Sequence, residues 1–74
     1  MKYLVLEIQT IRKDGAVAKL ITVHDTIEEA YQKFYTVLAA AAVSGELLSC
    51  HSAVLLDSKG WLIENKVFDR EATE

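Results

Sequence analysis

The pattern of apolar and polar positions over the first 24 residues predicts a β-hairpin. Residues 2–12 and 16–24 are rich in aliphatic, aromatic and β-branched side chains, which favour strands. They flank an Asp-Gly dipeptide at positions 14–15. Such a pair between two apolar runs is typical of a two-residue turn, in which both central residues need a positive φ. A loop of this length places Ile8 opposite Ile21.

This register sorts the side chains of the hairpin onto two faces. The first face is entirely aliphatic and comprises Leu4, Leu6, Ile8, Ile21 and Val23. The second face is mixed and comprises Tyr3, Val5, Glu7, Gln9, Leu20, Thr22 and His24. Because successive side chains of a strand point to opposite sides, a slip by one residue would destroy this separation. We therefore expect the rest of the chain to cover the aliphatic face.

The hydrophobic period changes at Thr26, where a helix is predicted to begin. Thr26 and Glu29 have the spacing of a capping box, in which the threonine hydroxyl accepts from the amide three residues on and the glutamate reaches back. Apolar residues then recur every three or four positions, which predicts a helix over residues 27–43 with one buried stripe. The stripe comprises Ile27, Ala30, Tyr31, Phe34, Val37, Leu38, Ala41 and Ala42.

A second hairpin is predicted after the helix. Residues 51–56 and 61–68 are strand-like, and the four residues between them begin with Asp and end with Gly. This spacing favours a type I turn that continues into a β-bulge. It leaves open whether Leu56 or Asp57 pairs with Trp61.

The elements occur in the order ββαββ, which predicts an α+β domain of two layers. Neither hairpin is stable alone, so we expect the two to merge into one four-stranded antiparallel sheet with the helix across one face. The simplest connections produce the strand order 2-1-3-4, and an order with the fourth strand beside the first is the alternative. We expect residues 1–68 to form this single domain and residues 69–74 to be a frayed, polar C-terminal tail.

Chain length and composition indicate self-association. The chain has 74 residues, 51% of them hydrophobic, and a chain of this size buries only about 60% of the surface that its unfolded form exposes. Its single cysteine cannot close an internal disulfide. One helix leaves one face of the sheet open, and we expect a homodimer, or else an unidentified protein partner, to cover that face. The predicted interface comprises Tyr3, Val5, Leu20 and Trp61. Trp61 has an alternative role as a cap over the end of the core.

The charge of the chain argues against nucleic acid and membrane partners. Eight basic and eleven acidic residues produce a formal net charge of -3, which opposes binding to nucleic acid. The basic residues of the first hairpin, which have no aromatic residues interleaved among them, are Lys2, Arg12, Lys13 and Lys19. The longest apolar run, residues 37–43, is far shorter than the roughly 20 residues of a membrane span. The N-terminal residues lack a signal-peptide pattern, so we expect a cytoplasmic protein.

Residues that could bind a metal or perform catalysis are few and poorly placed. The side chains of metal-ligand type are His24, Asp25, Cys50 and His51. The predicted topology puts His24 and His51 at opposite ends of the sheet, about 20 Å apart, and directs the adjacent Cys50 and His51 to opposite faces. The serines lack the sequence context of known nucleophiles, and the glycines form no phosphate loop. We therefore expect no catalytic, cofactor-binding or metal-binding residues.

Most of the chain is covered by three segments that carry a resemblance, namely MKYLVLEIQT, HDTIEEAYQKFYTVLAAAAVS and HSAVLLDSKG. They resemble a group of short uncharacterised proteins encoded in prophages and mobile elements of Gram-positive gut bacteria. The resemblance implies a phage or mobile-element context and no particular activity. The chain departs from that group at residues 45–48, where Gly-Glu-Leu-Leu stands in place of a more polar connection.

Two function hypotheses follow from these patterns. The first is a small cytoplasmic, non-enzymatic interaction or accessory protein that acts through a face or an edge of its sheet. The alternative is a small ligand-binding protein or enzyme whose site forms at a subunit interface, with His24 or His51 beside a tyrosine. The absence of any recognisable catalytic motif favours the first.

Overall fold

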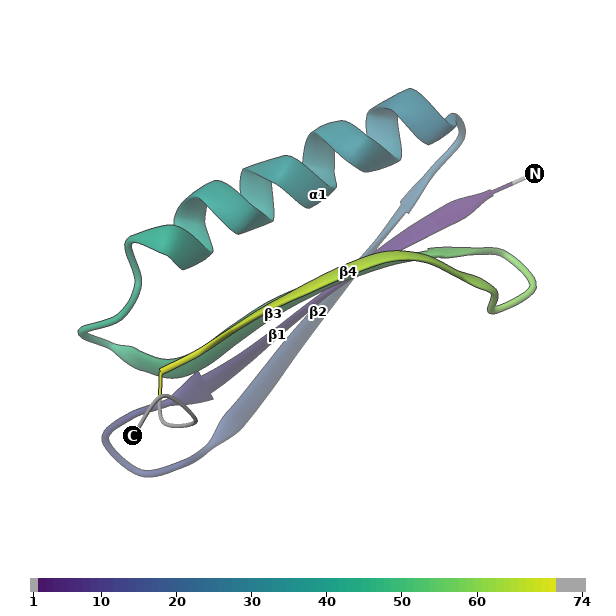
Figure 1. Ribbon diagram of the computed structural model, residues 1–74. Coiled ribbons are helices and arrows are strands. Elements are labelled where there is room, and N and C mark those ends of the chain that lie inside the picture. Colours follow the sequence, from purple (N-terminus) through teal and green to yellow (C-terminus); the bar gives the residue numbers. More distant parts are fainter. Residues whose placement is uncertain (1, 71–74) are drawn as a thin grey trace.

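The computed structural model describes residues 2–70, which form one helix and one sheet (Figure 1). The elements are β1 (Tyr3–Ile11), β2 (Val17–His24), α1 (Ile27–Ala42), β3 (Leu48–Asp57) and β4 (Leu62–Asp69). Neighbouring strands are antiparallel, and their order is β2-β1-β3-β4. Figure 1 shows α1 crossing one side of the twisted sheet and leaving the other side uncovered. The predicted α+β fold and strand order 2-1-3-4 are confirmed, and the alternative strand order is wrong.

The helix begins where the capping box predicts. Thr26 is the N-cap, and its Oγ1 accepts a hydrogen bond from Glu29 N over 3.2 Å. The Glu29 carboxylate contacts the Thr26 hydroxyl at 3.1 Å. The acidic first turn also suits the positive end of the helix dipole. The helix ends at Ala42 with Val43 as its C-cap, which agrees with the predicted end at about residue 43.

Each strand differs from its predicted range by at least one residue, and the largest difference is at the start of β3. β3 begins at Leu48 rather than at residue 51, because Leu48 pairs with Ile11 of β1 and Arg12 N donates to Leu47 O. β4 ends at Asp69, so this residue belongs to the sheet and not to a tail. Residues 71–74 of the predicted tail lie outside the described residues.

The first hairpin has a longer loop than the sequence predicts. Ile11 N donates to Ala16 O over 2.8 Å, and Gly15 N donates to Ile11 O over 2.8 Å, so residues 12–15 form a four-residue loop. Gly15 has a φ of +74°, whereas no non-glycine residue of the described chain has a positive φ. A two-residue type I′ turn needs a positive φ at both positions. Asp14 instead accepts from Ala16 N through its side chain, and the predicted two-residue loop is wrong.

The longer loop shifts the register of the hairpin by two residues. Leu6 lies opposite Ile21 and Ile8 lies opposite Lys19, so the predicted pairing of Ile8 with Ile21 is wrong. A shift of two residues keeps every side chain on its predicted face, because side chains alternate with a period of two. The aliphatic and mixed faces of the hairpin are therefore present as predicted.

The helix covers the mixed face of the hairpin and not the aliphatic one. Val5 is 1% exposed and belongs to a core that includes Leu55 of β3 and Phe34 of α1. Tyr3 packs against the same core. The prediction that Tyr3 and Val5 lie on the uncovered side of the sheet is therefore wrong.

Two features allow the mixed face to be buried. Ala53 of β3 is fully buried, and its small side chain leaves room for the helix above the sheet. The polar residues of this face satisfy one another: Glu7 contacts His51, and Thr22 Oγ1 lies 2.8 Å from His24 Nε2. A polar group that keeps a hydrogen bond loses little on burial. Hydrophobicity alone therefore did not decide which face the helix covers.

The other two predicted interface residues are exposed. Leu20 lies opposite Glu7, on the same side of the sheet as α1 but on the outer strand β2. Trp61 is 71% exposed at the turn between β3 and β4, so it does not cap the core. That Leu20 and Trp61 belong to an interface stays a prediction.

The second hairpin has the predicted turn. Gly60 N donates to Asp57 O over 3.0 Å, and Asp57 N donates to Trp61 O over 3.0 Å. The Asp57 carboxylate also accepts from Trp61 N over 2.9 Å. A bulge follows, since the register shifts between Leu55 and Leu56. Asp57, rather than Leu56, therefore pairs with Trp61.

Gly60→Ala is expected to lower the free energy of unfolding by about 1 to 2 kcal/mol. Gly60 has a φ of +93°, where an L side chain is strained, and a Cβ there would meet no atom within 4 Å. Backbone strain is therefore the only cause of the loss. Gly60→Asn should be milder, because asparagine tolerates the left-handed region better than alanine. Urea unfolding measures both variants, and an alanine variant as stable as the wild type would contradict this turn geometry.

Candidate functional site

Four rows of cross-strand neighbours lie on the side of the sheet that α1 leaves uncovered, which we call the open face. Residues directly opposite each other share a side of the sheet, so the register defines the rows. The first row comprises Val23, Leu4, Leu56 and Leu62. The second row comprises Ile21, Leu6, Val54 and Asn65. The third row comprises Lys19, Ile8, Ser52 and Val67. The fourth row comprises Val17, Thr10, Cys50 and Asp69.

The open face is aliphatic at the first row and becomes polar toward the fourth. Its outer strands are the most exposed, with Ile21 at 53% and Val67 at 49%, while Leu6 and Val54 on the inner strands are partly covered by their neighbours. A patch four strands wide and seven residues long spans about 450 Å² in projection, since strands lie about 4.8 Å apart and rise about 3.4 Å per residue. The first two rows are aliphatic except for Asn65 and occupy about half of this area. An exposed apolar patch on a small protein is often a binding surface.

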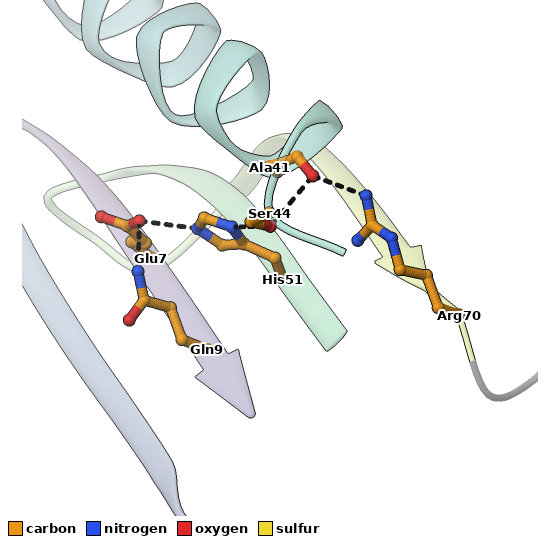
Figure 2. Close-up of polar contacts among 6 residues, drawn as sticks. All are labelled: Glu7, Gln9, Ala41, Ser44, His51 and Arg70. Atoms are coloured by element: carbon orange, nitrogen blue, oxygen red, sulfur yellow. Dashed lines mark hydrogen bonds and ion pairs between the residues drawn. The ribbon is translucent and has the colours of Figure 1, made fainter. Parts of the chain in front are cut away.

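A buried polar network lies on the opposite side of the sheet, beneath the C-terminal end of α1 (Figure 2). His51 of β3 is 2% exposed, and its Nε2 lies 2.6 Å from Oε2 of Glu7 on β1. His51 Nδ1 lies 3.0 Å from Ser44 Oγ, just after the helix. Gln9 Nε2 donates to Glu7 Oε2 over 3.0 Å. This network ties β1, β3 and the end of α1 together.

Ser44, His51 and Glu7 are the residue types of a serine-histidine-carboxylate catalytic triad. Their hydrogen bonds differ from those of a triad. The Ser44 hydroxyl donates to Ala41 O over 3.1 Å, and its oxygen lies 3.0 Å from His51 Nδ1, where the donor depends on the imidazole tautomer. A general base must instead accept the nucleophile's proton. The network therefore acts as a structural clamp on the helix end. Sequence reasoning missed it because Glu7 and Ser44 stand 44 and 7 residues from His51.

Arg70 completes the contacts at the end of α1. Its Nη2 donates to Ala41 O over 2.8 Å (Figure 2). Its guanidinium carbon lies 5.7 Å from the centre of the Phe68 ring. The last turn of α1 has no basic residue of its own, so Arg70 supplies the positive charge that suits the negative end of the helix dipole. A Cβ on Gly45 would lie 2.5 Å from Arg70 Nε, so glycine leaves room for this side chain. Arg70 belongs to the predicted frayed tail of residues 69–74, and the prediction is wrong for this residue because it is docked on the helix.

The residues of metal-ligand type are not brought together. His24 pairs with Tyr3 and His51 pairs with Gln9, so the two histidines lie at opposite ends of β1, as predicted. Cys50 lies on the open face and His51 on the covered one. Among residues 2–70, no group of three or more His, Cys, Asp and Glu side chains is placed to hold a metal ion.

Asp25 contacts Lys2 near the same end of the sheet as His24. The hydrogen bond from the Lys2 ammonium and its positive charge lower the pKa of Asp25 below the usual value of an aspartate. Both side chains are largely exposed, so water and salt screen the pair. This contact adds no chemistry to the open face or to the network.

A shallow hollow of about 540 Å³ lies between the first hairpin loop and the segment before β3. Its apolar lining comes from Ile11, Leu47 and Leu48. Arg12, the nearest guanidinium, already donates to Gly45 O over 2.8 Å. The polar side chains of its lining are Gln9, Arg12, Lys13 and Glu46. The open face is the stronger candidate for function because its aliphatic first row extends over all four strands.

Comparisons with known proteins do not assign this site. No family model, curated protein or solved structure matches the chain. Over residues 2–70, no helix is both long and apolar enough to cross a membrane.

Proposed function

We propose that this chain is a small non-enzymatic interaction protein that forms a homodimer through its open face. The observation that carries the proposal is the aliphatic first row, which crosses all four strands, together with the second row, which is aliphatic except for Asn65. The patch has no cover within residues 2–70, because α1 lies on the other side of the sheet. Sheets with one uncovered apolar face commonly pack against a second sheet, with side chains interdigitating about 10 Å apart.

The area of the open face suits a second copy of the chain. Two facing patches together span about 900 Å² in projection, and the relief of the side chains increases the area that they bury. A specific interface buries about 1,000 Å² or more. A two-fold contact lets one self-complementary patch cover itself, which is the usual solution for small soluble chains.

The alternative function, a ligand-binding or catalytic site at the subunit interface, is less well supported. Neither His24 nor His51 lies on the open face, because their β1 neighbours Tyr3 and Gln9 lie on the covered side. A dimer formed through the open face would not place either imidazole at its interface. We also propose a cytoplasmic location and a phage or mobile-element origin, which the resemblance in the sequence supports.

Leu6→Lys is expected to dissociate the proposed dimer, because it places an ammonium group in the second row at the centre of the apolar patch. Light scattering coupled to size exclusion should show the wild type at twice the 8.3 kDa chain mass and the variant near 8.3 kDa. Ile21→Lys, at an exposed position of the same row, gives a second variant that the monomer fold tolerates.

Gln32→Lys, exposed on α1, is the matched control and should leave the dimer intact. Circular dichroism confirms that each variant is folded. A wild-type chain that stays monomeric at 100 μM, or folded Leu6→Lys and Ile21→Lys variants that remain dimeric, would overturn the proposed use of the open face.

A further inference from the structure

We propose that the two copies pack with their two-fold axis parallel to the strands, so that Lys19 of each copy pairs with Asp69 of the partner subunit. This inference rests on the proposed homodimer and names its geometry. Sheets packed face to face keep their strands within about 30° of each other. A two-fold axis in the plane of the interface can then run along the strands or across them.

The gradient of polarity along the open face separates these two arrangements. An axis along the strands places each row over the same row of the partner, so the aliphatic first rows meet each other. An axis across the strands reverses the rows and packs the first row, with Leu4 and Leu56, against the fourth row, with Thr10 and Cys50. The second arrangement buries polar groups against aliphatic ones and leaves less apolar area in contact. The axis along the strands is therefore favoured.

The two charged residues of the open face support the same axis. Lys19 lies on the outer strand β2 and Asp69 on the outer strand β4, in adjacent rows, and both are exposed. An axis along the strands brings β2 of one copy over β4 of the other, since these are the two edges of the sheet. Adjacent rows are about 6.8 Å apart along a strand, a distance that a lysine side chain can span. The dimer would contain this ion pair twice, once at each edge.

An axis across the strands produces no such pair. It places β2 over β2 of the partner and β4 over β4, so Lys19 faces aliphatic residues of the partner's β2 and Asp69 faces Leu62 of the partner subunit. Charge complementarity at the rim of an interface sets orientation more than affinity. Lys19 and Asp69 are therefore orientation determinants of the dimer rather than its main source of binding energy.

A charge-reversal series tests this geometry. The dimer dissociation constants of the wild type, Lys19→Asp, Asp69→Lys and the double variant are measured by sedimentation at low ionic strength. Each single reversal creates two like-charge contacts per dimer, so we expect both to weaken the dimer about tenfold or more. The double variant restores opposite charges and should return to within about threefold of the wild type. Lys59→Asp, at the exposed tip of the second hairpin, controls for the change in net charge.

The outcomes separate the geometry from the proposed function. Weakened single variants with a restored double variant support the axis along the strands. Two outcomes overturn this axis but leave the homodimer in place. In the first, the charge reversals change the dissociation constant no more than Lys59→Asp does. In the second, the double variant dimerises more weakly than either single variant. A wild type that is monomeric throughout overturns the homodimer and this geometry together.

Discussion

Val5→Lys is expected to unfold the protein at 25 °C. Val5 is 1% exposed between the sheet and α1, where its core neighbours include Phe34 and Leu55. An ammonium group at this position loses its hydration without a carboxylate to pair with, and the side chain is too large for the site. The expected loss of about 5 kcal/mol or more is comparable with the whole stability of a chain of this size, about 4 to 11 kcal/mol. Circular dichroism and thermal melting measure the effect.

Val43→Lys is the matched control, because Val43 is 84% exposed just after α1. A lysine there also suits the negative end of the helix dipole, so the control should melt within a few degrees of the wild type. The pair of variants tests which face the helix covers. If Val5→Lys melts as late as Val43→Lys, then Val5 is not in the core, and the face assignment of the hairpin is wrong.

Glu7→Leu is expected to lower the free energy of unfolding by about 3 kcal/mol, because it leaves buried His51 without its carboxylate. Replacing one partner of a buried polar pair removes the hydrogen bond between them. The remaining partner stays buried away from water, and the cost of its desolvation is no longer offset. The double variant Glu7→Leu with His51→Leu removes both polar groups and fills the site with apolar atoms. It should therefore recover at least half of the loss.

Urea unfolding measures the free energy of unfolding of the wild type, Glu7→Leu, His51→Leu and the double variant. The four values provide the coupling free energy between Glu7 and His51. Lys66→Leu, an exposed change on β4, serves as a surface control and should shift the free energy by about 0.5 kcal/mol or less. Strictly additive losses would show that the two side chains do not contact each other in solution. That result would contradict the hydrogen bond between Glu7 and His51 beneath the end of α1.

Local signals in the sequence account for the helix, the strands and the turn of the second hairpin. Thr26 and Glu29 start the helix through contacts three residues apart, and the turn beginning at Asp57 closes through contacts three and four residues apart. These interactions depend on neighbouring residues, so the pattern of residue types predicts them. The order of elements and their lengths then restrict how four strands and one helix can pack, and the strand order follows.

The candidate site was only partly predictable for the same reason. The aliphatic face formed by Leu4, Leu6 and Ile8 was evident from alternation, and it survived a register error because that error was an even number of residues. The sequence does not show that the helix leaves this aliphatic face uncovered. Hydrophobicity alone favours burial of the aliphatic face over burial of the mixed face. Tyr3 and Val5 were therefore predicted on the wrong side of the molecule.

By itself, the sequence determined the helix, the two hairpins and the antiparallel order of the strands, since each depends on the period of apolar residues or on the conformational needs of a turn. Only the tertiary structure decided the four-residue loop, the covered face, and the docking of the helix end by Glu7, His51 and Arg70. Glu7 and His51 are 44 residues apart, and Arg70 lies 29 residues from the carbonyl of Ala41 that it contacts. The burial of a polar face becomes favourable once such distant partners satisfy each other, and that condition exists only in the folded chain.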